Sequence, residues 1–389
     1  MGDGRRRLQR LTGGWGGLAL QVGLVAVLVL TAWWMGHNAE VNMQTRGVAS
    51  GFDFLDRPAG FDITQALVPY EPTDTHRRVF LVGALNTLLV AALGIAAATG
   101  LGLLAGVLRV SRNYLARTAA TAYVELARNT PLPVQILVWY NLMLVAPPPK
   151  DALGIDGLIF LTNRGLYLPK PVFNAEGGTA LAAGGAAVVV GALLASWLKR
   201  RRTFTGHAPS PRWGWALAVA GVVAALVVTG NPTGFDLPHL EGWGFTGGVS
   251  LAPALTALWA ALSFYTGGFI AEVVRGGLNA VSPGQGEAAR SLGLDEGQAL
   301  SLVVLPQAMR VIVPPLASQY LNLTKNSSLA VIIGYPDLVA VFAGTSLNQT
   351  GQAIETLALV MAFYLVISLS ISAFMNWWNS RSAVWAVSR

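Results

Sequence analysis

The sequence predicts an all-α protein that crosses a membrane several times, and three observations support this fold class. Hydrophobic residues make up 53% of its 389 residues, charged residues make up 12%, and the mean hydropathy is +0.52. Several stretches also reach the roughly 20 apolar residues that a helix needs to cross the hydrocarbon core of a bilayer. Cysteine is absent, which excludes thiolate metal sites, and the four histidines are too scattered to suggest zinc.

About eight apolar segments qualify as membrane spans. The first, residues 18–36, ends near Trp33 and Trp34, as expected of an aromatic belt; a signal peptide is the alternative, but no cleavage pattern follows. The second, residues 79–108, carries no charge and contains several glycines, which predict close helix contacts. The other segments are residues 123–145, 180–198, 213–229, 251–274, 315–333 and 356–378.

Basic residues lie beside these segments and predict the topology. With residues 5–7 in the cytoplasm, an alternating path puts residues 109–117, residues 199–202 and Arg381 on the same side. This satisfies the positive-inside rule, places both termini in the cytoplasm and leaves residues 38–78 as a long exterior loop. The net charge of +7 forms no continuous basic stripe, so the expected partner is the lipid bilayer and not nucleic acid.

The predicted cytoplasmic loop at residues 282–306 is unusually polar and contains helix signals. Ser282 and Pro283 fit an N-cap followed by a first-turn proline, and Gly293 is placed to end this helix in the left-handed region. Asp295, followed three residues later by Gln298, predicts a capping box and a second short helix that stops at Pro306. The loop is therefore expected to form a helix, a glycine elbow and a helix, although a solvated connector is the alternative.

The spacing of the residues in this loop resembles the EAA loop of ABC importer permeases. The matching positions are Glu287, Ala288, Ala289, Gly293, Val303, Leu305 and Pro306. Other stretches resemble the polar amino-acid branch of that family: YVELARNTPLPVQ at residues 123–135, SFYTGGFIAEVVRGGLNAVSPGQGEAARSLGL at residues 263–294, LNLTKNSSLAVIIGYPDL at residues 321–338 and GALNTLLVA at residues 83–91. The resemblance implies that the loop is a coupling helix that binds a partner ATPase.

The resemblance also implies an organisation and a set of partners. Residues 79–146 and 251–389 would form the five-helix core of a type I importer permease, residues 1–78 an extra span with a periplasmic loop, and residues 147–250 an insertion with two more spans. Similar additions occur in permeases of general L-amino-acid importers. The implied partners are an ABC ATPase that binds ATP and Mg, a second related permease chain and a periplasmic binding protein that delivers an L-amino acid to the bacterial inner membrane for alternating access. No cofactor is expected in this chain.

Lys325 lies in the most polar of the predicted spans. If that span begins at Pro315, ten residues at ~1.5 Å each place Lys325 about 15 Å inward, where an ammonium group needs a partner or a water-filled path. Lys325 would then hold the α-carboxylate of a substrate, form a fixed ion pair with Glu125 or Glu272, or lie closer to the cytoplasm. The residues expected to line a substrate pathway are Lys325, Asn322, Asn326, Ser327, Gln319 and Tyr265.

Two E-x-x-R pairs, Glu125 with Arg128 and Glu272 with Arg275, have a spacing that allows pairing on one helix face. They are interpreted as structural ion pairs or as parts of an inner gate. No catalytic residue is expected: no lysine follows a glycine, so the chain has no P-loop and ATP hydrolysis is left to a partner. The alternatives are a secondary transporter without an ATPase, for which internal repeat halves should be visible, and a structural membrane subunit.

Overall fold

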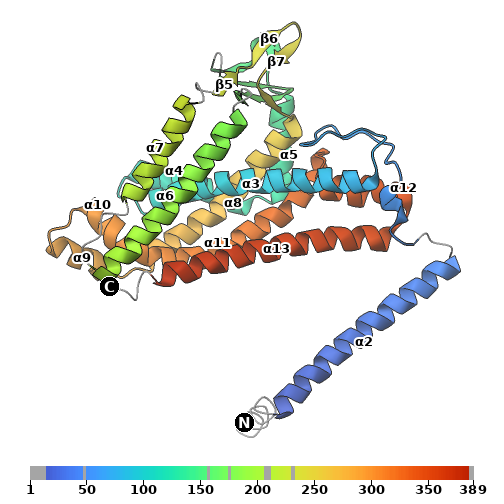
Figure 1. Ribbon diagram of the computed structural model, residues 1–389, viewed down its shortest axis with the longest axis horizontal. Coiled ribbons are helices and arrows are strands. Elements are labelled where there is room, and N and C mark those ends of the chain that lie inside the picture. The colour runs from blue at the N-terminus through green and yellow to red at the C-terminus, as the bar shows by residue number, and fades with distance from the viewer. Residues whose placement is uncertain are drawn as a thin grey trace. The chain divides into compact units, whose positions relative to one another are not determined.

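The computed structural model describes residues 15–46, 50–155, 158–173, 177–205, 212–228 and 233–384, and most of them are helical (Figure 1). The predicted basic group at residues 5–7 lies outside the described residues. The chain divides into two compact units, Met1–Leu89 with Pro336–Arg389, and Val90–Tyr335. The long helix α3 (His76–Arg109) contributes its first part to one unit and its second part to the other.

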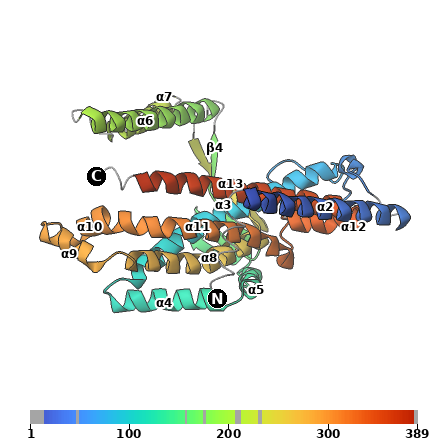
Figure 2. The ribbon, with the colours of Figure 1, turned by 90° about the horizontal axis from the view of Figure 1, so that it is seen from below.

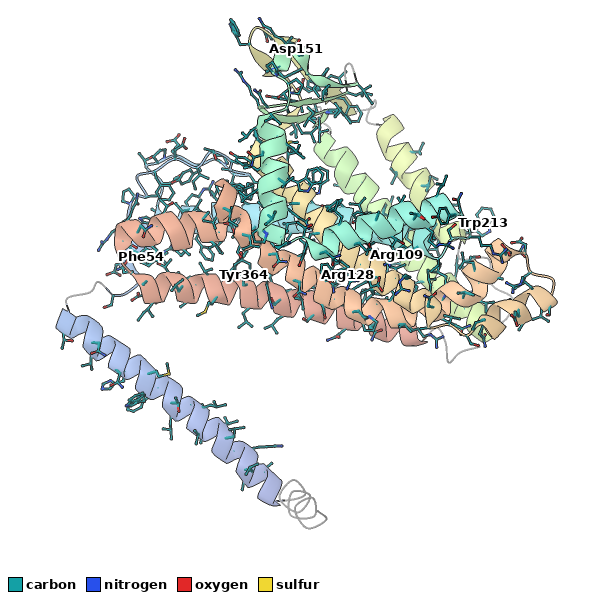
Figure 3. All side chains as sticks on the ribbon, turned by 180° about the vertical axis from the view of Figure 1, so that it is seen from behind. Phe54, Arg109, Arg128, Asp151, Trp213 and Tyr364 are labelled. Atoms are coloured by element: carbon teal, nitrogen blue, oxygen red, sulfur yellow. The ribbon has the colours of Figure 1, made fainter. Side chains whose placement is uncertain are left out.

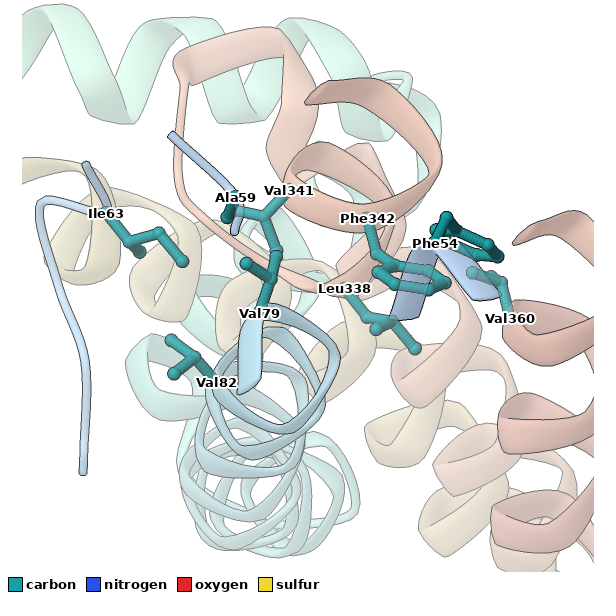
Figure 4. Packing of buried hydrophobic residues seen from close by; sticks show 9 residues of the cluster. All are labelled: Phe54, Ala59, Ile63, Val79, Val82, Leu338, Val341, Phe342 and Val360. Carbon is teal, nitrogen blue, oxygen red and sulfur yellow. The ribbon is translucent and has the colours of Figure 1, made fainter. Parts of the chain in front are cut away.

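The first unit has a buried core around the start of α3. Besides the first part of α3, this unit contains α2 (Trp15–Arg46), the 3₁₀ helix η1 (Asp53–Asp56), the π-helical turn η5 (Val339–Ser346), α12 (Leu347–Thr350) and α13 (Ala353–Val384). Phe54 of η1 belongs to the same buried cluster as Val79 and Val82 of α3, and its ring lies 6.1 Å from that of Phe342 of η5 (Figure 4). The segment between α2 and α3 is therefore held in place by hydrophobic side chains that it shares with α3, η5 and α13.

Polar side chains of α3 form hydrogen bonds with the segment that joins the predicted spans at residues 315–333 and 356–378. The Asn86 amide donates hydrogen bonds to the carbonyls of Gln65 and Pro336, both at 2.8 Å. The Thr87 hydroxyl accepts the Leu338 N–H at 3.0 Å, and Asp337 accepts the N–H of Ala340 at 2.9 Å. Asn86 and Thr87 of the sequence GALNT thus bind both the segment before α3 and the segment that leads into η5 to one helix.

The second unit is built around α8 (Pro253–Asn279). Helices α4 (Tyr114–Asn129), α5 (Leu132–Leu144) and α11 (Leu305–Asn326) all pack on it. The prediction of one span at residues 123–145 is wrong, because the chain leaves the helix at Thr130, where ψ is 126°. A residue before proline is disfavoured in the α region, and Pro131 supplies that constraint.

Glycines allow the helices of the second unit to approach closely. A Cβ at Gly102 of α3 would lie 2.4 Å from a methyl carbon of Ile270, and one at Gly106 would lie 2.6 Å from Val274. Another at Gly268 of α8 would lie 2.7 Å from the Cβ of Ala127. Small residues at these positions bring α3 and α4 against α8, as interfaces between membrane helices favour.

The insertion contains strands that the all-α prediction did not include. Strands β1 (Leu153–Ile155), β2 (Ile159–Thr162), β3 (Gly165–Leu168) and β8 (Val249–Leu251) form an antiparallel sheet in that order, while β4 (Lys170–Phe173) pairs with β5 (Thr233–Asp236) and β6 (His239–Glu241) with β7 (Gly244–Thr246). Helices α6 (Gly177–Thr205) and α7 (Arg212–Val228) form a hairpin that packs through Gly191 and Gly214. Its sequence lies between β4 and β5.

Five helices among the described residues are long and apolar enough to cross a membrane. They are Leu18–Asn38, His76–Arg109, Pro253–Asn279, Glu296–Ile333 and Ala353–Asn379, and shorter apolar helices occur at Leu132–Leu144, Ala182–Leu198 and Trp213–Ala224. The protein is therefore a multi-pass membrane protein, but the predicted total of about eight spans is not confirmed.

Candidate functional site

The loop at residues 282–306 begins with the predicted helix and glycine elbow. Helix α9 (Pro283–Ser291) follows Ser282, whose side chain makes no capping hydrogen bond. Gly293 has φ +86°, its N–H donates to the Arg290 carbonyl at 2.9 Å, and the N–H of Leu294 donates to the Ala289 carbonyl at 3.2 Å. This pair of bonds is a Schellman motif, which requires the left-handed conformation that glycine adopts readily.

The second helix begins as predicted but does not stop at Pro306. Asp295 and Gln298 form the reciprocal capping box at the start of α10 (Glu296–Ala299). A π-helical turn, η3 (Leu300–Val304), then joins α10 to α11, and the N–H of Leu305 donates to the carbonyl of Leu300. Proline is tolerated in the first turn of a helix, so Pro306 fits into α11 and does not end it. Figure 2 shows α9 and α10 at one end of α8 and α11.

The loop presents a mainly exposed surface. Ala289 is buried, whereas Glu287, Ala288, Gly293, Leu305 and Pro306 are exposed. Leu292, directly before the elbow, is 84% exposed, which is a large apolar side chain left in solvent in the single chain. Leu292 was not singled out in the sequence analysis.

Glu272 of α8, about two helical turns before that helix ends at Asn279, is the centre of an ion-pair cluster. Arg109 of α3 and Arg275 of α8 donate hydrogen bonds to its carboxylate, and Arg128 of α4 lies 3.7 Å from it. Figure 3 labels two of these arginines, Arg109 and Arg128. The Glu272–Arg275 pair is therefore present, but Arg128 faces Glu272. Within the described residues Glu125 is exposed and has no ion pair, so the expected Glu125–Arg128 pair is not formed.

A second tie connects the loop to the end of α3. Arg112 lies 3.1 Å from Glu296 of α10, and the Gln307 amide donates to Gln285 of α9 at 3.1 Å. Both members of the Arg112 ion pair are strongly exposed, so this contact contributes little to stability. The sequence marked Arg109 and Arg112 only as topology signals, since nothing local identifies residues that pair with a segment far along the chain.

A polar pocket of about 370 Å³ lies between α8 and α11. Four predicted pathway residues line it, and Thr266 and Phe269 complete it; the full lining is Tyr265, Thr266, Phe269, Gln319, Asn322 and Asn326. The sequence reasoning missed Thr266 and Phe269, although Phe269 follows Tyr265 by one helical turn. None of the lining residues carries a formal charge.

Lys325 and Ser327 lie outside this lining. Ser327 is buried and its hydroxyl donates to the Thr324 carbonyl at 2.8 Å, while Lys325 is exposed. Helix α11 starts at Leu305 and includes Pro314 and Pro315 in its interior, so the helix does not begin at Pro315, and Lys325 lies about 30 Å along it from its start. Neither Glu125 nor Glu272 forms an ion pair with Lys325 within the described part of the chain.

Comparisons with known proteins identify the family. Residues 98–383 match the family described as binding-protein-dependent transport system inner membrane component. YhdX of Escherichia coli strain K12, named as an amino-acid ABC transporter permease protein, is 48% identical over 94% of this chain and 93% of its own length. The general L-amino acid transport system permease protein AapQ of Rhizobium johnstonii is 45% identical over 94% and 91%.

A third relative extends the match to another organism. The glutamate/glutamine/aspartate/asparagine transport system permease protein BztB of Rhodobacter capsulatus is 40% identical over 93% of this chain and 92% of its own length. The matches thus include the extra N-terminal helix and the insertion as well as the core. Since the family model covers most of the sequence and full-length relatives match it nearly end to end, the chain belongs to the family of binding-protein-dependent transport system inner membrane components.

Proposed function

We propose that this permease imports L-amino acids, with a preference for polar or broad-range substrates, and that it works by alternating access. The observation that carries the proposal is the continuity between the loop and the pocket: the capped helix α10 runs through η3 into α11, whose Gln319, Asn322 and Asn326 line the pocket. The names of the full-length relatives support amino acids as the substrate class. Family membership argues against the alternative of a secondary transporter without an ATPase.

The proposed assembly contains separate partners for energy and delivery. An ABC ATPase that binds ATP and Mg would dock on the loop through Glu287, Ala288, Ala289, Gly293, Leu305 and Pro306, with the exposed Leu292 as an apolar contact. One loop serves one ATPase subunit, so a second related permease chain completes the importer. A periplasmic amino-acid-binding protein would dock on the exterior loops, with both termini of this chain in the cytoplasm and the spans in the inner membrane.

The geometry suggests how ATP binding would change the pocket. Closure of the two ATPases would pull α9 and its counterpart in the second permease together. The loop joins the end of α8 to the start of α11, and these two helices form the walls of the pocket. A displacement of the loop would therefore move both walls, opening the pocket to the exterior when the ATPases close.

The lining of the pocket suits an amino acid without selecting a charge. The amides of Gln319, Asn322 and Asn326 supply donors for an α-carboxylate and acceptors for an α-ammonium group, and Tyr265 adds a hydroxyl. Because the lining has no formal charge, the pocket would accept amino-acid substrates whose side chains differ in charge, in agreement with a broad range of substrates. Lys325 and Ser327, which lie beside this face of α11, stay in the proposal as residues that a conformational change could bring into the pathway.

The experiment that tests the proposal has two steps. A tagged chain is solubilised from native membranes, and copurifying proteins are identified by mass spectrometry. Copurification of an ABC ATPase and a second permease is expected. The complex is then reconstituted in liposomes with its binding protein, and uptake of L-glutamine is measured with and without ATP.

Asn322→Ala and Asn326→Ala are expected to reduce uptake at least fivefold, whereas Ser318→Ala serves as the control because Ser318 is exposed on the same helix outside the lining. Uptake that needs no ATP would contradict the importer assignment. Uptake that is normal in both asparagine variants would remove the pocket from the pathway.

A further inference from the structure

We propose that Arg128 is a positioning residue that exchanges between two carboxylates, Glu272 on α8 and Glu125 on its own helix, and so links the pocket to the coupling loop. The inference rests on the transport function proposed above. It concerns the regulation of the ATPase by the pocket.

Arg128 is the least tightly held member of the ion-pair cluster. Its guanidinium nitrogen lies 3.7 Å from the Glu272 carboxylate, beyond hydrogen-bond length, whereas Arg109 and Arg275 both donate hydrogen bonds to that carboxylate. The Arg128 side chain is 42% exposed, compared with 14% for Arg109. Removing Arg128 from Glu272 would therefore leave the carboxylate with two hydrogen-bonded arginines.

Arg128 also touches the wall of the pocket. Its guanidinium carbon lies 5.3 Å from the centre of the Phe269 ring, within the range of a cation–π interaction. Phe269 lines the pocket, and its ring lies 4.9 Å from that of Tyr265, which also lines the pocket. A molecule that displaces either aromatic ring in the pocket would change the surface on which Arg128 rests.

The stem of Arg128 is held close to α8 while its head remains free to move. A Cβ at Gly268 would lie 3.6 Å from the Cγ of Arg128 and 2.7 Å from the Cβ of Ala127. The close approach of α4 and α8 at Gly268 thus fixes the start of the side chain. The guanidinium beyond it is 3.7 Å from Glu272, at a distance that leaves it without a hydrogen bond to that carboxylate.

Glu125 is the second carboxylate. It lies three residues before Arg128 on α4, a spacing at which oppositely charged side chains can pair on a helix. It is exposed and, in the described part of the chain, has no ion pair. An exposed pair with Glu125 would contribute little to stability, and the present contact of Arg128 with Glu272, at 3.7 Å, is too long to be a hydrogen bond. Neither position holds Arg128 strongly, so a small change at Phe269 would be enough to shift the balance between them.

The exchange would alter how α4 is attached to α8 next to the coupling loop. Helix α8 ends at Asn279, and the loop begins three residues later at Ser282. With Arg128 on Glu272, the end of α4 is tied to the last turns of α8. With Arg128 on Glu125, the contact between Arg128 and Glu272 is lost, and α8 can move together with the loop while α4 stays in place.

The test measures ATP hydrolysis by the assembled importer in liposomes, with and without its binding protein saturated with L-glutamine. Glu125→Gln removes only the second position of Arg128, so stimulation by the loaded binding protein should fall at least fivefold without a rise in the basal rate. Arg128→Gln removes both positions, so the basal rate should rise while stimulation is lost. Arg117→Gln, an exposed arginine on the same helix, is the control and should behave like the wild type.

The double variant of Glu125 and Arg128 should match Arg128→Gln alone, because Glu125 acts only through Arg128. Glu125→Gln is exposed and does not threaten folding, so it decides the question even if Arg128→Gln fails to assemble. Wild-type stimulation in Glu125→Gln would overturn the exchange while leaving the transport function intact. A wild-type importer that no loaded binding protein stimulates would refute the proposed function, and with it this inference.

Discussion

Replacing Gly293 with valine should uncouple the ATPase from transport while leaving membrane insertion unchanged. Gly293 has φ +86° and forms the elbow between α9 and α10. Nothing lies within 4 Å of the position that a Cβ would occupy, so the substitution introduces no steric clash. Its whole effect comes from the backbone conformation, which a β-branched residue disfavours strongly.

The magnitude follows from the cost of holding valine in the left-handed region, which is about 2 kcal/mol. A cost of that size reduces the population of the native elbow roughly thirtyfold relative to competing conformations. The Schellman bonds of Gly293 to Arg290 and of Leu294 to Ala289 would be lost together. Asparagine tolerates the left-handed region better than other residues with a side chain, so Gly293→Asn should retain much of the coupling.

The assay compares uptake with ATP hydrolysis in liposomes and measures the amount of the chain in the membrane. Gly276→Val is the matched control: it makes the same change on α8, where a Cβ also meets nothing within 4 Å but φ is not positive. The ratio of uptake to hydrolysis should fall at least fivefold in Gly293→Val and stay near the wild-type value in Gly276→Val. If Gly293→Val couples normally, the shape of the elbow is not what the ATPase recognises.

Three further substitutions test the fold, each by thermal unfolding in detergent. Gly102→Ala should destabilise the protein by about 1–3 kcal/mol, because its Cβ would lie 2.4 Å from Ile270, whereas Gly100→Ala, with open space, should not. Asn86→Ala removes one buried and one partly buried hydrogen bond and should cost about 2–3 kcal/mol. Burial raises the pKa of Asp337, which lies between two candidate spans, from 3.8 to about 7, so wild-type stability should fall as the pH rises from 4 to 7 and Asp337→Asn should lose that dependence.

The sign of the Asp337 effect follows from proton binding. Below pH 3.8 the carboxyl is protonated in both the native and the unfolded state, so its contribution is complete. Between pH 3.8 and about 7 the unfolded state releases a proton that the native state keeps, which costs the native state up to roughly 4 kcal/mol by the upper pH. A pH dependence that is the same in wild type and Asp337→Asn would mean that the buried carboxyl is not the group that titrates.

Local signals in the sequence predicted the helical elements of the loop. The capping box of Asp295 with Gln298 and the elbow at Gly293 depend only on neighbouring residues, so they could be read directly. The rule that proline restricts the preceding residue would also have divided residues 123–145 at Pro131. The prediction that the second helix stops at Pro306 was wrong, because the π-helical turn η3 changes the hydrogen-bond pattern just before that residue. Such turns have no clear sequence signal.

Interactions between distant segments could not be predicted in the same way. Arg109 forms its hydrogen bond with Glu272, which is 163 residues away in the sequence. Arg128 lies beside Glu272, and not beside Glu125 three residues before it, because α4 packs on α8. The pocket was partly predicted, since polar residues in an apolar span are unusual whatever the tertiary fold. In the sequence analysis, Lys325 was emphasised as a pathway residue because of its charge. The packing of α11 on α8 decides which face of α11 forms the pocket, and that face carries Gln319 and Asn322.

The loop at residues 282–306 has two physical connections to the pocket, and they approach it from opposite walls. One is covalent, from α10 through η3 into α11, which carries Asn322. The other runs from α8 through Glu272 and Arg128 to Phe269. Because α8 and α11 are the two ends of the same loop, a force on α9 must either change the pocket or be absorbed where the loop joins them. The π turn η3 is the irregular point on one side and Arg128 the loosest contact on the other, so the efficiency of coupling should depend on the stiffness of these two places more than on the lining of the pocket.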